Sequence, residues 1–226
     1  MTITELSYIE HGLSQKISAI THTQKSMYSR YEIAEEIGYK TESLAIPHQT
    51  HSTNVLFVNS AGEFENCDGL ITANPNIVLS LQTADCIPIF LYDKSTAARG
   101  LVHAGWRGVV GGIVSNAIDL MVSKGSIVEN IHVFLGPSIC MNCYEVGAEV
   151  ADQFENKNKK KLGGGKWFVN LHGQVECQLL DLGVLASKIK SSPICSFEND
   201  NCCSYRRDGE NAGRMYSFLG VKNGFH

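Results

Sequence analysis

The chain has 226 residues, of which 43% are hydrophobic, and it carries a formal net charge of -4 at pH 7. This length is sufficient for a full hydrophobic core, and we expect residues 1–226 to form a single α/β domain. The slightly acidic balance disfavours binding to nucleic acid or to an anionic membrane. Because the sequence has no long apolar run and no secretory leader, we expect a soluble, cytoplasmic protein whose eight cysteines are mostly reduced.

In chain order, strands and helices are expected to alternate. Apolar, β-branched runs predict strands at 54–58, 77–81, 87–92, 101–103 and 131–135. Apolar residues at helical spacing predict helices at 109–124, 144–157 and 178–190. Residues 156–166, where lysines run into three glycines, are predicted to form a solvated, mobile loop. This stretch lacks the pattern of a phosphate-binding loop, because Lys166 is followed by Trp167 and not by Ser or Thr.

Three separate motifs adjoin short apolar runs and carry candidate metal ligands. The motifs are P-H-Q-T-H-S at 47–52, T-A-D-C-I-P at 83–88 and V-H-A-G-W-R-G at 102–108. They supply His51, Cys86 and His103, whose nitrogen and sulfur donors suit a single Zn²⁺ with one position left open. Asp85, next to the cysteine, is expected to orient a ligand histidine. Sequence spacing alone does not bring the three ligands together, so this remains a hypothesis about an enzyme.

The turn after His103 contains small residues that allow the backbone to approach a ligand closely. It leads into a helix expected to begin near Val109, whose first amides favour an anion. Arg107 is placed to help bind a phosphate there. In the alternative interpretation, Arg107 pairs with a carboxylate such as Asp85 and only fixes the turn.

Seven sequence blocks, in order, resemble those of the YfiH/laccase-domain family. The family is also described as multicopper polyphenol oxidase or purine nucleoside phosphorylase, and it includes the mammalian protein FAMIN. The blocks are HQTHS at 48–52, DGLIT at 68–72, TADCIPIFLYD at 83–93, VHAGWRG at 102–108, LGPSI at 135–139, CYEVG at 143–147 and SYRRDG at 204–209. The resemblance extends from roughly residue 8 to the C-terminus.

The resemblance implies a single-domain α/β/β/α sandwich with mixed sheets, and a zinc held by His51, Cys86 and His103 as the catalytic centre. It also implies phosphorolysis of adenosine, inosine, guanosine and methylthioadenosine, together with deamination of adenosine. His48 lies outside the part of the motif that carries the ligand, so we expect it to support a ligand or to contact substrate. The implied partners are purine nucleosides and phosphate.

Phosphorolysis needs a site for phosphate and groups that position the ribose. We expect Arg107, together with Arg206 or Arg207, to bind phosphate, because a planar guanidinium matches it in a bidentate fashion. Tyr144 and Glu145 are expected to orient the ribose or to support the residues that contact it. The alternatives are that the arginines pair with carboxylates and that the tyrosine packs in the core.

Two other enzyme classes are weighed against this hypothesis. A laccase-type copper oxidase needs about ten histidine ligands and a cysteine, whereas the chain has eight histidines. A cysteine hydrolase acting on cell-wall precursors would use Cys86 as nucleophile and His103 as its base. Metal content separates these hypotheses, because a cysteine bound to zinc is not a free nucleophile.

One further motif has no assigned role. Cys140 and Cys143 have the C-x-x-C spacing of a metal or redox site, but neither Cys195 nor the adjacent Cys202 and Cys203 supplies a second pair of similar spacing. Their purpose, the preferred nucleoside and the oligomeric state are not determined by the sequence.

Overall fold

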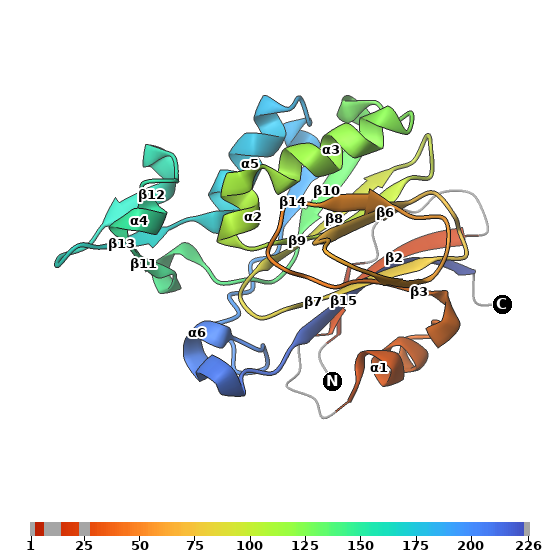
Figure 1. The fold of residues 1–226 in the computed structure, drawn as a ribbon, viewed down its shortest axis with the longest axis horizontal. Helices are drawn as coiled ribbons and strands as arrows, with labels where there is room; N and C mark the ends of the chain where they lie inside the picture. Colours follow the sequence, from red (N-terminus) through yellow and green to blue (C-terminus); the bar gives the residue numbers. More distant parts are fainter. Residues whose placement is uncertain (1–2, 7–14, 23–27, 224–226) are drawn as a thin grey trace.

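Two six-stranded sheets and one three-stranded sheet form the framework of the described part of the chain (Figure 1). The computed structural model describes residues 3–6, 15–22 and 28–223. The first sheet has the order β1 (Ile3–Leu6), β2 (Gln15–His22), β15 (Met215–Asn223), β7 (Val78–Thr83), β3 (Leu44–Pro47), β5 (Gly62–Phe64). The second has the order β14 (Ile189–Ser191), β10 (Ile131–Leu135), β8 (Ile87–Asp93), β9 (Arg99–Ala104), β6 (Gly69–Thr72), β4 (Val55–Phe57).

Each of the two large sheets combines parallel and antiparallel pairs. In the first sheet β3 runs parallel to β5 and β7, while β15 runs antiparallel to β2 and β7. In the second sheet β8, β9 and β10 pair antiparallel, and β14 and β4 add parallel strands at the edges. The three-stranded sheet is antiparallel and consists of β11 (Glu145–Gly147), β13 (Lys166–Val169) and β12 (Lys159–Lys161).

Helices cover the outer faces of the two large sheets (Figure 1). The helix α1 (Arg30–Glu36) packs Ile33 and Ala34 against Phe218 of the first sheet, and a capping box between Ser29 and Glu32 fixes its start. On the other side lie α2 (Trp106–Gly111), α3 (Ile113–Ser123) and α5 (Leu171–Asp181). The expected α/β/β/α sandwich with mixed sheets is therefore confirmed.

The hydrophobic core is divided among the spaces between these layers. Between the two sheets, Leu79 of β7 and Leu219 of β15 pack with Leu70 of β6 and Leu101 of β9. A larger cluster joins the second sheet to α3 and α5, and a smaller one joins the first sheet to α1. Because the central strands β7, β8 and β9 are buried on both faces, their sequences are apolar over nearly their whole length.

The predicted strands correspond to β4, β7, β8, β9 and β10. The helix predicted at 109–124 is present as two helices, α2 and α3, and begins earlier, at Trp106. The break lies at Gly112, whose φ of 94° is a left-handed conformation that glycine adopts readily. The shorter elements are α4 (Ala148–Ala151), α6 (Tyr205–Asp208) and 3-10 turns at Thr41–Ser43, Val128–Asn130, Met141–Cys143, Asn156–Asn158, Ala186–Lys188 and Gly209–Asn211.

Two helix predictions and one loop prediction are wrong. In 144–157 the only α-helix is the short α4, because residues 145–147 pair with β13 and the sheet overrides the apolar spacing. The helix expected at 178–190 is α5, which starts at Leu171, after an Asn170 cap, and ends at Asp181 before a left-handed Gly183. The expected loop at 156–166 is largely the β12–β13 hairpin, in which Lys159 and Lys161 lie over Trp167.

None of the helices in the described part of the chain has both the length and the apolar character needed to cross a bilayer.

Candidate metal centre and active-site pocket

His51, Cys86 and His103 converge at one end of the two sheets. One donor atom from each lies within 4.8 Å of the others. Cys86 immediately precedes β8, and His103 lies near the end of β9. The antiparallel register pairs Ile87 with Ala104 and Pro88 with His103, so the sulfur and the imidazole are neighbours.

His51 reaches this centre from the other sheet, on the loop that follows β3. Its φ of 58° lies in the left-handed region, which few non-glycine residues occupy. The carboxylate of Asp68 stabilises this loop by accepting hydrogen bonds from the backbone N–H groups of Thr50, His51 and Ser52, at 3.1, 3.0 and 2.7 Å. The buried carboxylate of Asp68 therefore stabilises the strained backbone conformation that places the His51 imidazole at this centre.

Asp68 also contacts the second histidine. Its Oδ1 lies 2.7 Å from Nδ1 of His103, and both side chains are buried. Burial by itself would raise the Asp68 pKa, but hydrogen bonds from His103 and Ser52 hold that pKa well below its usual range. An Nδ1–H donated to this carboxylate leaves Nε2 of His103 as the free donor atom.

The carboxylate that orients a ligand histidine is that of Asp68 and not, as the sequence predicted, that of Asp85. Asp85 lies at the crossing from β7 to β8 with a φ of 81°. Its carboxylate accepts hydrogen bonds from Oγ of Ser196 and the backbone N–H of Arg206, each at 2.6 Å. Asp85 therefore anchors neighbouring loops and not a ligand histidine. The DGLIT block contained the missed signal, because an aspartate that opens a buried strand needs partners.

The donor set fits a zinc ion. Two imidazoles and one thiol are donors that Zn²⁺ commonly uses. Burial opposes ionisation of Cys86, yet His103 and His51 lower its pKa to about 6, so the thiolate needed for metal binding is favoured. At Gly105 an added Cβ would lie 3.0 Å from Cys86 Sγ and 3.2 Å from His51 Cδ2. The absence of a side chain there leaves the donors room to converge.

The three residues line a pocket of about 500 Å³, which is a size suited to a small organic molecule. Its other walls come from both sheets, from α2 and from α6. The remaining lining residues are Gln49, Gln82, Thr83, Ala84, Asp85, Gly105, Trp106, Arg107, Ile139, Tyr144, Leu171, Tyr205, Arg206 and Arg214. The pocket thus combines three potential metal ligands with three guanidinium groups.

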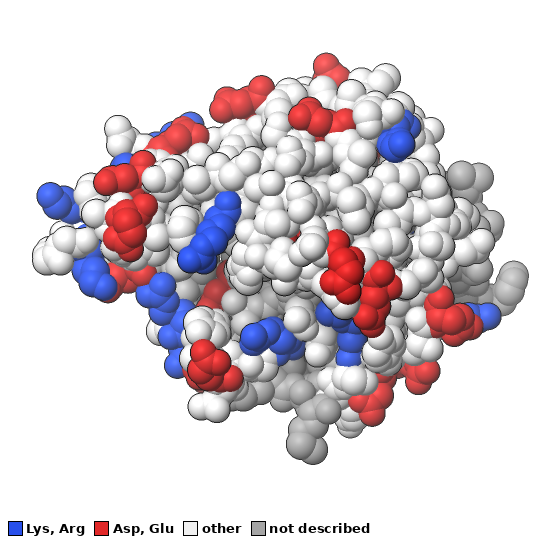
Figure 2. All heavy atoms as spheres, viewed as in Figure 1, with Lys and Arg blue, Asp and Glu red and all other residues white. Residues whose placement is uncertain are grey.

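The guanidinium groups are held by their neighbours. Arg107 lies over the ring of Trp106, with 4.5 Å between its Cζ and the ring centroid. Arg206 lies over the ring of Tyr144 at 5.4 Å and donates from Nη1 to a backbone carbonyl at 2.6 Å. Arg214, which the sequence analysis did not identify, lines the same pocket. Figure 2 shows Lys and Arg interspersed with Asp and Glu on the face that carries α2 and α6.

Two of the predicted substrate contacts lie outside the pocket lining. Arg207 donates to the carbonyl oxygens of Ser196, Phe197 and Cys202 and pairs with Asp208, so its guanidinium fixes a loop. The ring nitrogens of His48 lie 2.8 Å from Glu63 and 2.9 Å from Glu65, on the surface. Neither residue is retained among the proposed substrate contacts.

Tyr144 lines the pocket. Burial is the main cause that raises the pKa of its phenol, so the hydroxyl is neutral at physiological pH and available as a hydrogen-bond donor. No ion pair joins Arg107 to Asp85 in the described part of the chain. The alternative role of Arg107, as a partner of Asp85, is therefore not supported.

The chain is similar over most of its length to known proteins. Residues 21–222 match the family described as multi-copper polyphenol oxidoreductase laccase. The chain is 35% identical over 199 residues to a purine nucleoside phosphorylase of Deinococcus radiodurans, covering 85% of this chain and 76% of that protein. It is 34% identical over 207 residues to adenosine deaminase RL5 from an unknown prokaryotic organism, covering 84% and 79%.

Solved structures show the same architecture. YlmD from Geobacillus stearothermophilus superposes with a TM-score of 0.83 at 27% identity, covering 92% of each chain. The hypothetical protein YfiH from Bacillus licheniformis gives a TM-score of 0.81 at 25% identity, covering 92% of this chain and 93% of that one. The chain therefore belongs to the multi-copper polyphenol oxidoreductase laccase family, with the fold of YfiH and YlmD.

Proposed function

We propose that this protein is a zinc-dependent purine nucleoside phosphorylase that also deaminates adenosine. The observation that carries the proposal is the convergence of His51, Cys86 and His103 on a pocket that also contains three arginines. Relatives named purine nucleoside phosphorylase and adenosine deaminase support it. Adenosine, inosine, guanosine and methylthioadenosine are the proposed nucleoside substrates.

The chain's own residues provide sites for both substrates. Arg107, Arg206 and Arg214 offer positive charge and several N–H donors on the pocket wall, which suits inorganic phosphate. Tyr144 offers a neutral hydroxyl to the ribose or the purine. Held in one pocket, phosphate and nucleoside react as a preassociated pair, which removes much of the entropic cost of their encounter.

Asp68 positions two of the three proposed metal ligands, His51 and His103. By accepting a hydrogen bond from Nδ1–H of His103, this carboxylate keeps Nε2 directed at the metal position. When bound by these three ligands, Zn²⁺ supplies Lewis-acid chemistry that activates an oxygen nucleophile at neutral pH. Deamination of adenosine at C6 requires such a nucleophile.

Product analysis tests the proposal. The purified protein, with its metal counted, is incubated with adenosine or inosine, with and without phosphate, and products are separated by chromatography. Free base and ribose 1-phosphate that appear only with phosphate support phosphorolysis. Inosine formed from adenosine without phosphate supports deamination. A zinc-loaded protein that converts neither nucleoside would contradict the proposed function.

A cysteine hydrolase is the second candidate, because Cys86 has a lowered pKa and contacts His103, as a nucleophile and its base would. The two candidates differ in their response to a chelator. A hydrolase of amides such as cell-wall precursors would retain activity after metal removal, and iodoacetamide would then inactivate it. The proposed zinc enzyme would lose activity on chelation and recover it with Zn²⁺.

A further inference from the structure

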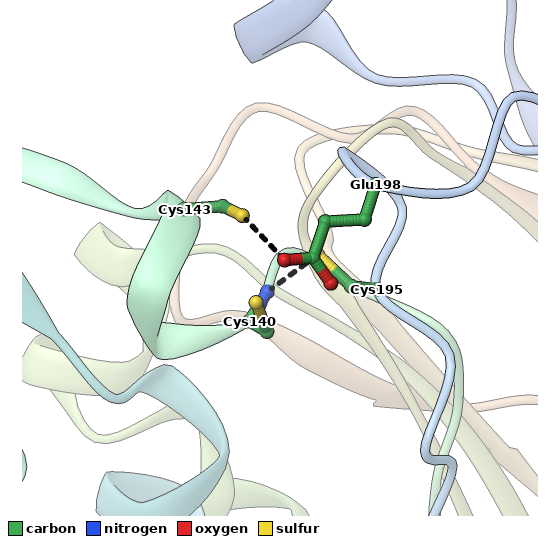
Figure 3. Close-up of side chains that lie close together, drawn as sticks. All are labelled: Cys140, Cys143, Cys195 and Glu198. Atoms are coloured by element: carbon green, nitrogen blue, oxygen red, sulfur yellow. Dashed lines mark hydrogen bonds between the residues drawn. The ribbon is translucent and has the colours of Figure 1, made fainter.

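A second group of potential metal ligands lies outside the proposed catalytic centre. Cys140, Cys143, Cys195 and Glu198 each place one donor atom within 4.8 Å of the others (Figure 3). Cys140 and Cys143 lie on the segment that follows β10, and Cys195 and Glu198 lie on the segment that follows β14. This group shares no residue with His51, Cys86 and His103.

The same spacing of donors occurs in both segments, and it is recognised only when the structure brings the segments together. Cys140-x-x-Cys143 faces Cys195-x-x-Glu198, so each segment contributes two donors separated by two residues. Structural zinc sites frequently combine two such pairs. The sequence contains no second pair of cysteines at this spacing, because the fourth donor is the carboxylate of Glu198.

The backbone around Cys195 donates hydrogen bonds to its sulfur. Its Sγ accepts a hydrogen bond from the backbone N–H of Cys140 at 3.3 Å. Further backbone N–H groups, from Phe197 and Glu198, point to the same sulfur. Sγ of Cys143 lies 3.4 Å from Oε1 of Glu198. Three thiols and a carboxylate thus share one small volume, in which a cation would balance their charge once ionised.

From these contacts we infer that Cys140, Cys143, Cys195 and Glu198 form a second, structural site for a thiophilic divalent cation of the zinc class. Zn–S bonds of about 2.3 Å place the sulfurs of a tetrahedral site about 3.8 Å apart. The donors already lie within 4.8 Å of one another, so side-chain movements of about 1 Å bring them to that geometry. Binding forms metal–ligand bonds and releases the thiol protons to solvent.

The two segments joined by this cation also build the pocket. Ile139 and Tyr144 flank the first pair of cysteines and line the pocket. Ser196, next to Cys195, donates to Asp85, and the same carboxylate holds the backbone of Arg206. A cation at this site would therefore fix the wall that carries Tyr144 and Arg206 without contacting the substrate. The inference stands independently of the proposed reaction.

Cobalt binding to a Cys86→Ser variant tests the inference, because that variant loses the thiolate of the catalytic centre. Apoprotein kept under a reductant is titrated with Co²⁺ and followed by absorption. We expect one Co²⁺ per chain with an intense thiolate-to-cobalt charge-transfer band. Absence of this band in folded Cys86→Ser protein would overturn the inference.

Two further variants assign the site. In the Cys86→Ser background, Glu198→Gln removes one ligand from an exposed side chain and should weaken Co²⁺ binding at least about tenfold while keeping the thiolate band. The matched control is Cys177→Ser, a partly buried cysteine outside the group, which should leave binding unchanged. Unchanged affinity in Glu198→Gln would remove this residue from the site. A disulfide among Cys140, Cys143 and Cys195 in protein purified without oxidant, detected by thiol titration, would overturn the cation site.

Discussion

Oδ1 of Asp68 lies 2.7 Å from Nδ1 of His103 and 3.0 Å from the backbone nitrogen of His51. One buried carboxylate therefore positions two of the three proposed zinc ligands, which come from different sheets. The third, Cys86, is placed by the register between β8 and β9. The centre is therefore held together by hydrogen bonds to Asp68 and by the pairing of β8 with β9. These two contributions can be tested separately.

Replacement of Asp68 should lower the zinc affinity by more than a loss of protein stability explains. Asp68→Asn removes the charge that faces His103, and we expect zinc affinity to fall about 10- to 100-fold, as measured by competition with a chromophoric chelator. Asp93→Asn is the matched control, because Asp93 is equally buried and caps a turn through Ser95 and Thr96. Equal losses of zinc affinity in the two variants would show that Asp68 acts only through stability.

The thiolate of Cys86 should be required for both metal and activity. Cys86→Ser replaces the sulfur ligand with a poorer donor, so we expect the catalytic zinc to be lost together with nucleoside turnover. Metal content by elemental analysis should decrease by one ion per chain. Cys177→Ser, which changes a cysteine outside both groups of ligands, should keep the wild-type value. Retention of full metal content and activity in Cys86→Ser would contradict the assignment.

The open space at Gly105 should be required for ligand convergence. Gly105→Ala places a Cβ 3.0 Å from Cys86 Sγ, closer than ordinary van der Waals contact, so one ligand must move. We expect zinc affinity to decrease while the melting temperature changes little. Gly163→Ala serves as control, because its added Cβ meets nothing within 4 Å. If Gly105→Ala bound zinc as tightly as the wild type, the crowding argument would fail.

Arg107 should act on phosphate in preference to the nucleoside. Arg107→Lys keeps the charge but removes the bidentate geometry, and we expect the KM for phosphate to rise about tenfold, with a smaller change in the KM for inosine. Steady-state kinetics at varied phosphate measures this difference. Arg207→Lys should instead lower the melting temperature, since the Arg207 guanidinium donates to four backbone carbonyls, and should leave the phosphate KM unchanged. An equal rise in both KM values for Arg107→Lys would remove this residue from phosphate binding.

Local patterns determined much of the fold in advance. Continuous apolar runs predicted β7, β8, β9 and β10, because strands buried on both faces need apolar side chains throughout. Other local patterns failed at 144–157, predicted as a helix from apolar spacing, and at 159–161, predicted as loop from lysine and glycine content. Pairing with β13 decides the structure in both segments. Such pairing depends on strands that are distant in the sequence. The spacing of apolar residues within one segment gives no information about those strands.

The candidate site was likewise predicted in part from the sequence and decided in part by the tertiary structure. The sequence by itself provided the residue types of the candidate metal centre and, through the family blocks, the three residues His51, Cys86 and His103. Only the tertiary structure revealed Asp68 as the residue that holds His103, excluded Arg207 and His48 from the pocket lining, and joined Cys140 and Cys143 to Cys195 and Glu198. The physical reason is that a ligand site depends on which backbone segments meet, and sheet register and interlayer packing determine that meeting over the whole chain.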